Sequence, residues 1–148
     1  MRVFFLKDLP SQQMVQGYAE AHGVETETIA SGLAMMRRAS LMIRRLESYF
    51  SERGLSQLRF LVLIVIDREP DRDTLTVGEL TERLDVAGPV VARTLRLLLE
   101  DGLIAQAKDS RDARVKHVGL TGIGKETLDA LLPGYLAIIA EEMQKPLR

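Results

Sequence analysis

The segment between residues 108 and 116 carries the side chains with the clearest chemistry in this sequence. Its charged positions are four basic residues and two acids: Lys108, Asp109, Arg111, Asp112, Arg114 and Lys116. Clustered Lys and Arg side chains bind phosphate by charge, and Arg also binds it by paired hydrogen bonds. The segment is net positive, although the whole chain has a formal net charge of -1. The alternative is a solvated hairpin with weak surface ion pairs.

Arg93 is the best candidate for contacting a nucleic-acid base. A guanidinium can donate two hydrogen bonds to guanine, and such a pair discriminates against other bases by ~1–3 kcal/mol. The simpler alternative is that Arg93 touches a phosphate or an acidic neighbour. Within the basic segment, we expect Arg114 to fit a narrow minor groove and Asp112 to orient an arginine by a charge-assisted hydrogen bond.

The elements that would hold these side chains form a helix-turn-helix followed by a hairpin. Thr76 and Glu79 have the spacing of a capping box, which predicts a helix that starts at Thr76. Gly88 and Pro89 then open a second helix over residues 89–101. Strands on both sides of the basic segment complete the order of a winged helix-turn-helix, which places one helix in the major groove of DNA.

Three helices are predicted before this unit. They cover residues 8–22, 26–53 and 57–67, with Thr26 and Ser56 as caps and Gly54 as the end of the second helix. The third should be buried because residues 60–66 are apolar nearly all round. The second carries one stripe at steps of three and four: Ile29, Leu33, Met36, Ser40, Ile43, Leu46 and Phe50.

A C-terminal helix is predicted from Thr121 onward. Pro133 and Gly134 should break or kink it, giving two segments. Its apolar positions are Leu128, Leu131, Leu132, Leu136, Ile139 and Met143. Because the compact central unit cannot cover all these helices, we expect the terminal helices of two copies to pack as a symmetric homodimer. The alternative is that they fold back on their own central unit.

Length and composition set the broad class. The 148 residues are 46% hydrophobic and 28% charged, which is typical of a soluble globular protein. The absence of cysteine excludes disulfides, thiolate zinc sites and thiol redox switches. The N-terminus is apolar for too few residues to be a signal sequence, and no stretch approaches the ~18 apolar residues of a membrane span. We therefore expect a cytoplasmic protein without a membrane partner.

Catalytic chemistry has little support in the sequence. The two histidines, His22 and His117, are far apart and lack metal-ligand spacing, and no phosphate-binding glycine loop is present. We expect His117 to face solvent or a phosphate and His22 to interact with the last carbonyls of a helix. The sequence thus predicts no enzyme, no metal and no cofactor.

With these elements in place, the sequence resembles the MarR-type transcriptional regulators over about residues 33–135. The similar segments are residues 54–63, 77–86, 91–93, 100–104, 109–114 and 118–124. The strongest are the last two, which resemble the Asp-x-Arg of the family's wing and the Leu-Thr-x-x-Gly that restarts a helix. The resemblance implies a homodimer held by N- and C-terminal helices, bound to a pseudo-palindromic operator and often released by a small ligand.

In this type of docking, the start of the second helix lies against base edges and the wing reaches a minor groove or its phosphates. Val91, Leu95 and Leu98 share the opposite face of the helix and are assigned to the core. The candidate DNA contacts are Thr76, Gly88, Pro89, Val90, Ala92, Arg93, Arg96, Lys108, Arg111, Asp112, Arg114 and Lys116.

The second helix departs from the family pattern. Val90 and Ala92 stand where relatives commonly carry Thr or Ser, so fewer hydroxyls are available for hydrogen bonds. These two side chains can instead contact thymine methyl groups. An exposed Leu97 would equally suit a protein contact.

The family also implies a small-molecule pocket between the dimerisation helices and the winged unit. Its expected walls are Met35, Met36, Ala39, Ile43 and Leu61. Arg38 or Arg45 can meet an acidic ligand. The preferred interpretation is that the long helix has a solvated or DNA-facing side formed by Arg37, Arg38, Arg44 and Arg45. The lack of cysteine argues against a thiol-oxidising sensor.

The predicted fold class is mainly α with a small β-hairpin wing, a winged helix-turn-helix with long N- and C-terminal dimerisation helices. We expect one structural domain made of helices 1–53, the winged unit 54–120 and helices 121–148. The predicted function is a sequence-specific double-stranded DNA-binding transcriptional regulator, a homodimeric repressor open to release by a small-molecule effector. The alternative is a winged-helix protein-assembly module with little or no specific DNA binding.

Overall fold

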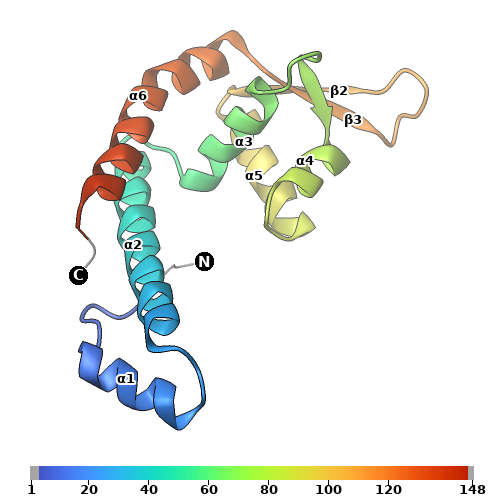
Figure 1. Cartoon of the computed structure of the whole chain (residues 1–148). Coiled ribbons are helices and arrows are strands. Elements are labelled where there is room, and N and C mark those ends of the chain that lie inside the picture. The colour runs from blue at the N-terminus through green and yellow to red at the C-terminus, as the bar shows by residue number, and fades with distance from the viewer. Residues whose placement is uncertain (1–3, 147–148) are drawn as a thin grey trace. The chain divides into compact units, whose positions relative to one another are not determined.

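The computed structural model describes residues 4–146 and shows a mainly helical chain with one small sheet (Figure 1). Residues 1–3 and 147–148, which the predicted terminal parts included, lie outside the described residues. The elements are α1 (Gln12–Ala21), α2 (Thr26–Ser51), α3 (Gln57–Asp67), β1 (Thr74–Thr76), α4 (Val77–Arg83), α5 (Gly88–Glu100), β2 (Ile104–Lys108), β3 (Lys116–Leu120) and α6 (Gly122–Gln144). They divide into two compact units, one of residues 1–49 with 135–148 and one of residues 50–134. The predicted fold class is confirmed.

The core of the 50–134 unit is built around α3. Gly54 ends the preceding helix with φ +72°, a conformation that glycine adopts without strain. Ser56 then caps α3, because its hydroxyl accepts a hydrogen bond from the backbone N–H of Arg59 at 3.1 Å. The Phe60 ring is fully buried, and its centroid lies 4.6 Å from that of Phe50. The prediction of a buried third helix over residues 57–67 is confirmed.

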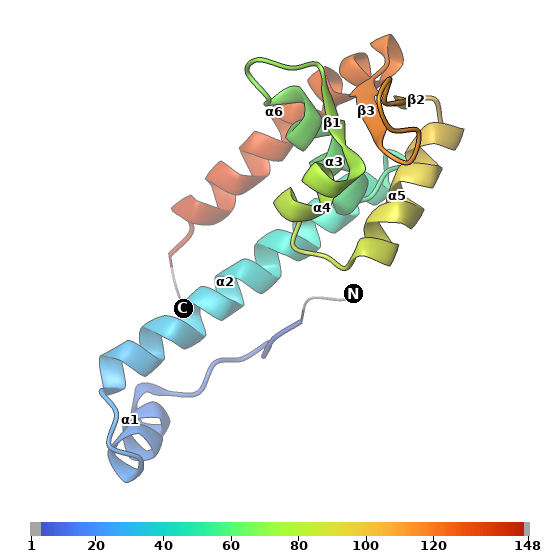
Figure 2. The same ribbon diagram turned by 90° about the vertical axis from the view of Figure 1, so that its right-hand side faces the viewer.

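The sheet has three antiparallel strands in the order β1-β3-β2, and Figure 2 shows β1 beside β3. Leu75 pairs with Val118 and both are fully buried, so this pair joins the sheet to the core. The hairpin of β2 and β3 was predicted, but β1 was not. Only three residues form it, and Thr76 ends the strand while also capping the next helix.

Two predicted helix boundaries are wrong. The first helix begins at Gln12 rather than at residue 8, because Pro10 disfavours helix in the residue before it and the Ser11 hydroxyl caps the helix by accepting from the N–H of Met14. The last helix, α6, is continuous from Gly122 to Gln144 with Pro133 inside it. Proline there removes one backbone donor, and the flanking hydrogen bonds keep the helix in one piece.

In the other unit, Arg38 and Arg45 of α2 bind the C-terminal turns of α6. The Arg38 guanidinium donates to the carbonyls of Met143 at 2.6 Å and Lys145 at 2.8 Å, which satisfies acceptors left open at the end of a helix. Arg45 pairs with the carboxylate of Glu142 at 3.0 Å. The expectation of a solvated or DNA-facing side is therefore wrong for Arg38 and Arg45, whereas Arg44 is exposed.

Candidate nucleic-acid interface

The second helix of the helix-turn-helix, α5, separates its residues into a buried and an outward side. Val91, Leu95 and Leu98 are buried, as predicted. Thr94 is buried with them, and its hydroxyl donates to the carbonyl of Val90 at 2.8 Å. The outward side chains are Pro89, Ala92, Arg93, Arg96 and Leu97. This arrangement leaves the first two turns of α5 accessible, so this part of the helix can enter a groove of DNA.

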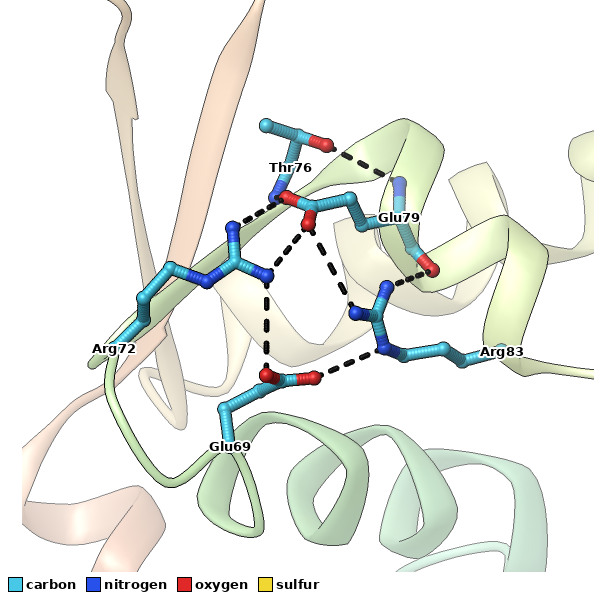
Figure 3. A network of polar contacts seen from close by, with 5 residues as sticks. All are labelled: Glu69, Arg72, Thr76, Glu79 and Arg83. Carbon is cyan, nitrogen blue, oxygen red and sulfur yellow. Dashed lines mark hydrogen bonds and ion pairs between the residues drawn. The ribbon is translucent and has the colours of Figure 1, made fainter.

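The first helix, α4, is held by a network of charged side chains (Figure 3). The Thr76 hydroxyl accepts from the N–H of Glu79 at 3.1 Å, and the Glu79 carboxylate accepts from the N–H of Thr76 at 3.0 Å, so the predicted capping box is present. Arg72 donates two hydrogen bonds to the same carboxylate, at 3.0 and 2.6 Å. Arg83 binds the neighbouring Glu69 at 2.9 Å and also donates to the carbonyl of Glu79 at 3.1 Å.

This network determines what Thr76 and Glu79 present to a ligand. The Arg72 guanidinium and the Thr76 N–H hold the pKa of Glu79 at about 2, so the carboxylate is ionised but paired. The Thr76 hydroxyl acts as acceptor within the capping box and keeps its O–H as a donor. A phosphate beside α4 would thus lie near a hydroxyl donor and near a carboxylate whose charge is balanced by Arg72.

A cleft of about 640 Å³ opens between the start of α4, the side of α5 and the hairpin. It is lined by Thr76, Val77, Gly78, Ala92, Leu95, Arg96, Leu99, Gln106, Arg114, Val115 and Lys116. Three of these side chains are basic and none is acidic. The structure therefore brings five of the predicted contact residues together around one positively charged cleft, although they lie up to 40 positions apart in the sequence.

The loop of the hairpin is shaped by two aspartates. The Asp109 carboxylate accepts from the backbone N–H groups of Arg111 at 2.9 Å and Asp112 at 3.1 Å, and it lies 2.8 Å from Nε2 of His117. The hydrogen bond with His117, followed by these backbone donors, lowers the pKa of Asp109. His117 thus pairs within the hairpin, whereas we had expected it to face solvent or a phosphate.

The arginine that Asp112 orients is Arg114. Its Nε and Nη2 atoms donate to the Asp112 carboxylate at 3.1 and 3.2 Å, which lowers the pKa of Asp112 and confirms the predicted charge-assisted bond. The Arg114 side chain is nevertheless 92% exposed. Lys108 and Lys116 lie directly opposite each other where the strands meet the loop, and both are exposed. Like charges in that position repel each other, and a polyanion would relieve the repulsion.

Comparison with known proteins identifies this arrangement. Residues 53–115, which span α3, the helix-turn-helix and most of the hairpin, match the model of the MarR family. The winged helix-turn-helix of this chain is similar to that of the MarR family. The chain is 28% identical over 140 residues to the HTH-type transcriptional repressor YetL of Bacillus subtilis, a match that covers 94% of this chain and 83% of YetL.

Solved structures of MarR-family proteins have the same fold. The regulator AbsC from Streptomyces coelicolor superposes with a TM-score of 0.71 at 18% identity, covering 80% of this chain and 79% of AbsC. A mutant of MarR from E. coli complexed with operator DNA gives a TM-score of 0.60 at 25% identity, covering 71% and 73% of the two chains. These relatives are transcriptional regulators rather than enzymes, as the sequence predicted.

Outside the winged unit, the chain has a second cavity, of about 680 Å³, in the unit formed by its two terminal parts. Its lining includes Lys7, Asp8, Leu9, Pro10, Ala34, Arg37, Arg38, Leu41, Glu142, Lys145 and Pro146. None of the five predicted pocket residues is among those that line it: Met35, Met36 and Ala39 are exposed, Ile43 is half-buried, and Leu61 belongs to the other unit. The Nη1 atom of Arg37 is buried, and none of the described residues gives it a hydrogen-bond partner.

Within residues 4–146, no group of three or more His, Cys, Asp or Glu side chains is placed to hold a metal ion. No helix in the same range is long and apolar enough to cross a membrane.

Four residues that shape the candidate site were not predicted from the sequence. Arg72 and Glu69 lie between α3 and β1, and only the fold shows that Arg72 binds both Glu69 and the Glu79 carboxylate of the capping box. The other two are Asp109 and His117, and the only signal for their pairing was that they lie on either side of a predicted hairpin turn.

Proposed function

We propose that this chain is a sequence-specific, double-stranded DNA-binding transcriptional regulator that acts as a homodimeric repressor on a pseudo-palindromic operator. The observation that best supports DNA binding is the cleft between α4, α5 and the hairpin. It is lined by three basic and no acidic side chains and lies beside the outward face of α5. A MarR protein with the same fold was crystallised with operator DNA, which supports the proposal.

The contacts divide by chemistry. Arg93 projects from the second turn of α5 and is assigned to guanine through two hydrogen bonds. Gly88 and Pro89 begin α5, where the backbone comes close to the groove, and Arg96 and the Thr76 hydroxyl are assigned to phosphates in the cleft. The hairpin provides the minor-groove and phosphate contacts through Lys108, Arg111, Arg114 and Lys116, with Asp112 orienting Arg114.

A homodimer is supported by apolar side chains that the unit of the terminal parts leaves exposed. They are Met14, Tyr18, Val24, Met35, Met36, Leu136 and Met143. Exposed apolar patches mark protein interfaces, so these side chains are assigned to the contact between two copies of the chain. Two recognition helices related by a twofold axis reach major grooves ~34 Å apart, which predicts half-sites ~10 base pairs apart.

Release by a small ligand is the remaining part of the proposal. The cavity of the terminal unit is large enough for a small molecule, and its lining has four basic side chains and two acids, Asp8 and Glu142. The buried Nη1 atom of Arg37 would gain a partner from an acidic ligand, since an unpaired buried donor is costly. The pocket predicted at Met35, Met36, Ala39, Ile43 and Leu61 stays a separate prediction.

The test is to make Arg93→Ala and Arg114→Ala separately and to measure operator affinity and oligomeric state. We expect Arg93→Ala to weaken binding by about 5- to 100-fold with relaxed selectivity at one base pair. Arg114→Ala should reduce the slope of log affinity against log salt by about 1. Arg44→Ala, an exposed arginine of α2, is the matched control and should change neither.

Retained operator binding in both variants would contradict the assignment. A second function, a winged-helix assembly module, is favoured by one observation: Leu97 is 40% exposed on α5. If no duplex is bound specifically, this module becomes the better account. Leu97→Ala should then abolish association with the partner protein while leaving the fold intact.

A further inference from the structure

The outward side of α5 carries no hydrogen-bond acceptor in its first two turns. Its N-cap residue, Ala87, makes no side-chain capping bond and is exposed. Pro89 and Ala92 are also exposed, and Val90 is half-buried with its carbonyl held by Thr94. The donors on this face are the guanidinium groups of Arg93 and Arg96.

The four bases of DNA differ in the hydrogen-bond donors and acceptors that they present to such a face. In the major groove, guanine presents two acceptors, whereas cytosine and adenine present amino groups that need an acceptor from the protein. Thymine presents an acceptor and a methyl group. A helix with arginines and apolar side chains alone can therefore satisfy guanine by hydrogen bonds and thymine by apolar contact, but it leaves the amino groups of adenine and cytosine without a partner.

We propose that α5 selects thymine through its methyl group, packed against Ala92 and the neighbouring Pro89 and Val90, next to a guanine held by Arg93. This inference rests on the proposed function and adds the chemistry by which the half-site is recognised. Rigidity favours it: Val90 is β-branched and stiff at χ1, Pro89 is a ring, and Ala92 has no rotatable side-chain bond, so the methyl contact orders no flexible group.

The test removes methyl groups from the DNA and leaves the protein unchanged. Each thymine of the operator obtained by selection from random duplexes is replaced, one at a time, by deoxyuridine, which lacks the 5-methyl group. We expect binding about fourfold weaker at one or two thymines next to the selected guanine, which corresponds to ~0.8 kcal/mol for one buried methyl-sized group. Thymines elsewhere in the same duplex serve as internal controls and should show no change.

A protein variant tests the same contact by gain of function. Ala92→Gln introduces an amide that can form two hydrogen bonds with one adenine, at N6 and N7. The preferred base at one position should therefore change from thymine to adenine. Ala130→Gln, at an exposed position of α6, is the matched control and should leave the selected sequence unchanged. The melting temperature of each variant shows whether it folds, and the deoxyuridine series does not depend on any variant.

The outcomes separate this inference from the proposed function. A selected operator whose affinity stays within twofold after every deoxyuridine replacement would overturn the methyl contact while leaving DNA binding in place. A half-site without thymine beside its guanine would also overturn it. Enrichment of no sequence at all would overturn the proposed function and this inference with it.

Discussion

The charge of Glu79 should stabilise the protein by an amount that depends on pH. Hydrogen bonds from Arg72 and from the N–H of Thr76 lower the pKa of this carboxyl from 4.5 to about 2. Each pKa unit corresponds to about 1.4 kcal/mol, so the full effect would be about 3 kcal/mol. The Glu79 side chain is 27% exposed, and solvent screening reduces the expected value to ~1–2 kcal/mol.

The direction follows from the lowered pKa. This contribution to the free energy of unfolding is complete above pH ~5 and is lost as the pH falls through 4.5 toward about 2, where the folded-state carboxylate takes up its proton. Glu79→Gln keeps an oxygen that can accept from Thr76 but removes the charge that Arg72 binds. The variant should therefore be less stable than the wild type at pH 7 by ~1–2 kcal/mol, and the difference should shrink toward pH 2.

The assay is urea unfolding of both proteins at a series of pH values, with the free energy of unfolding obtained by linear extrapolation. Glu82→Gln, an exposed acid on the same helix, is the control and should stay within ~0.5 kcal/mol of the wild type. A difference for Glu79→Gln that is constant from pH 7 to pH 3 would refute the reasoning. It would mean that the capping box is stabilised by its hydrogen bonds alone and not by the charge that pairs with Arg72.

Two further predictions concern packing in the 50–134 unit. A Cβ atom at Gly124 would overlap the backbone carbonyl of Leu103, so Gly124→Ala should destabilise the protein by ~1–3 kcal/mol or more, whereas Gly122→Ala, with open space around it, should be neutral or slightly stabilising in thermal unfolding. Leu98 is fully buried and Leu97 is 40% exposed, so Leu98→Ala should cost ~2–5 kcal/mol and Leu97→Ala less than ~1 kcal/mol; equal losses would contradict the assigned faces of α5.

Local signals in the sequence predicted the elements that depend on neighbouring residues. The capping box of Thr76 and Glu79, the stop at Gly54 and the cap at Ser56 each act within four positions, and all three are present in the structure. The two faces of α5 follow from helical spacing in the same way, since Leu95 is buried and Arg96 exposed. Such features require no knowledge of the rest of the chain.

The features that were missed depend on residues brought together by folding. Strand β1 is too short to show a periodic pattern and exists because Leu75 pairs with Val118, 43 positions away. Arg38 looked available to solvent because its partners, the carbonyls of Met143 and Lys145, are backbone atoms more than 100 positions later. Pro133 and Gly134 were expected to break or kink the last helix into two segments, whereas α6 is one continuous helix. A single sequence has no signal for partners of this kind.

The central claim is that the cleft, the outward face of α5 and the hairpin together form a DNA-binding surface. The most direct measurement is selection of bound sequences from random duplexes with the purified chain, followed by affinity for the selected duplex at increasing salt concentration. We predict an inverted repeat with half-sites ~10 base pairs apart and a steep fall of affinity with salt, because Lys and Arg contacts to phosphate release counterions. Enrichment of no sequence, with weak binding that is the same for all duplexes, would contradict the claim.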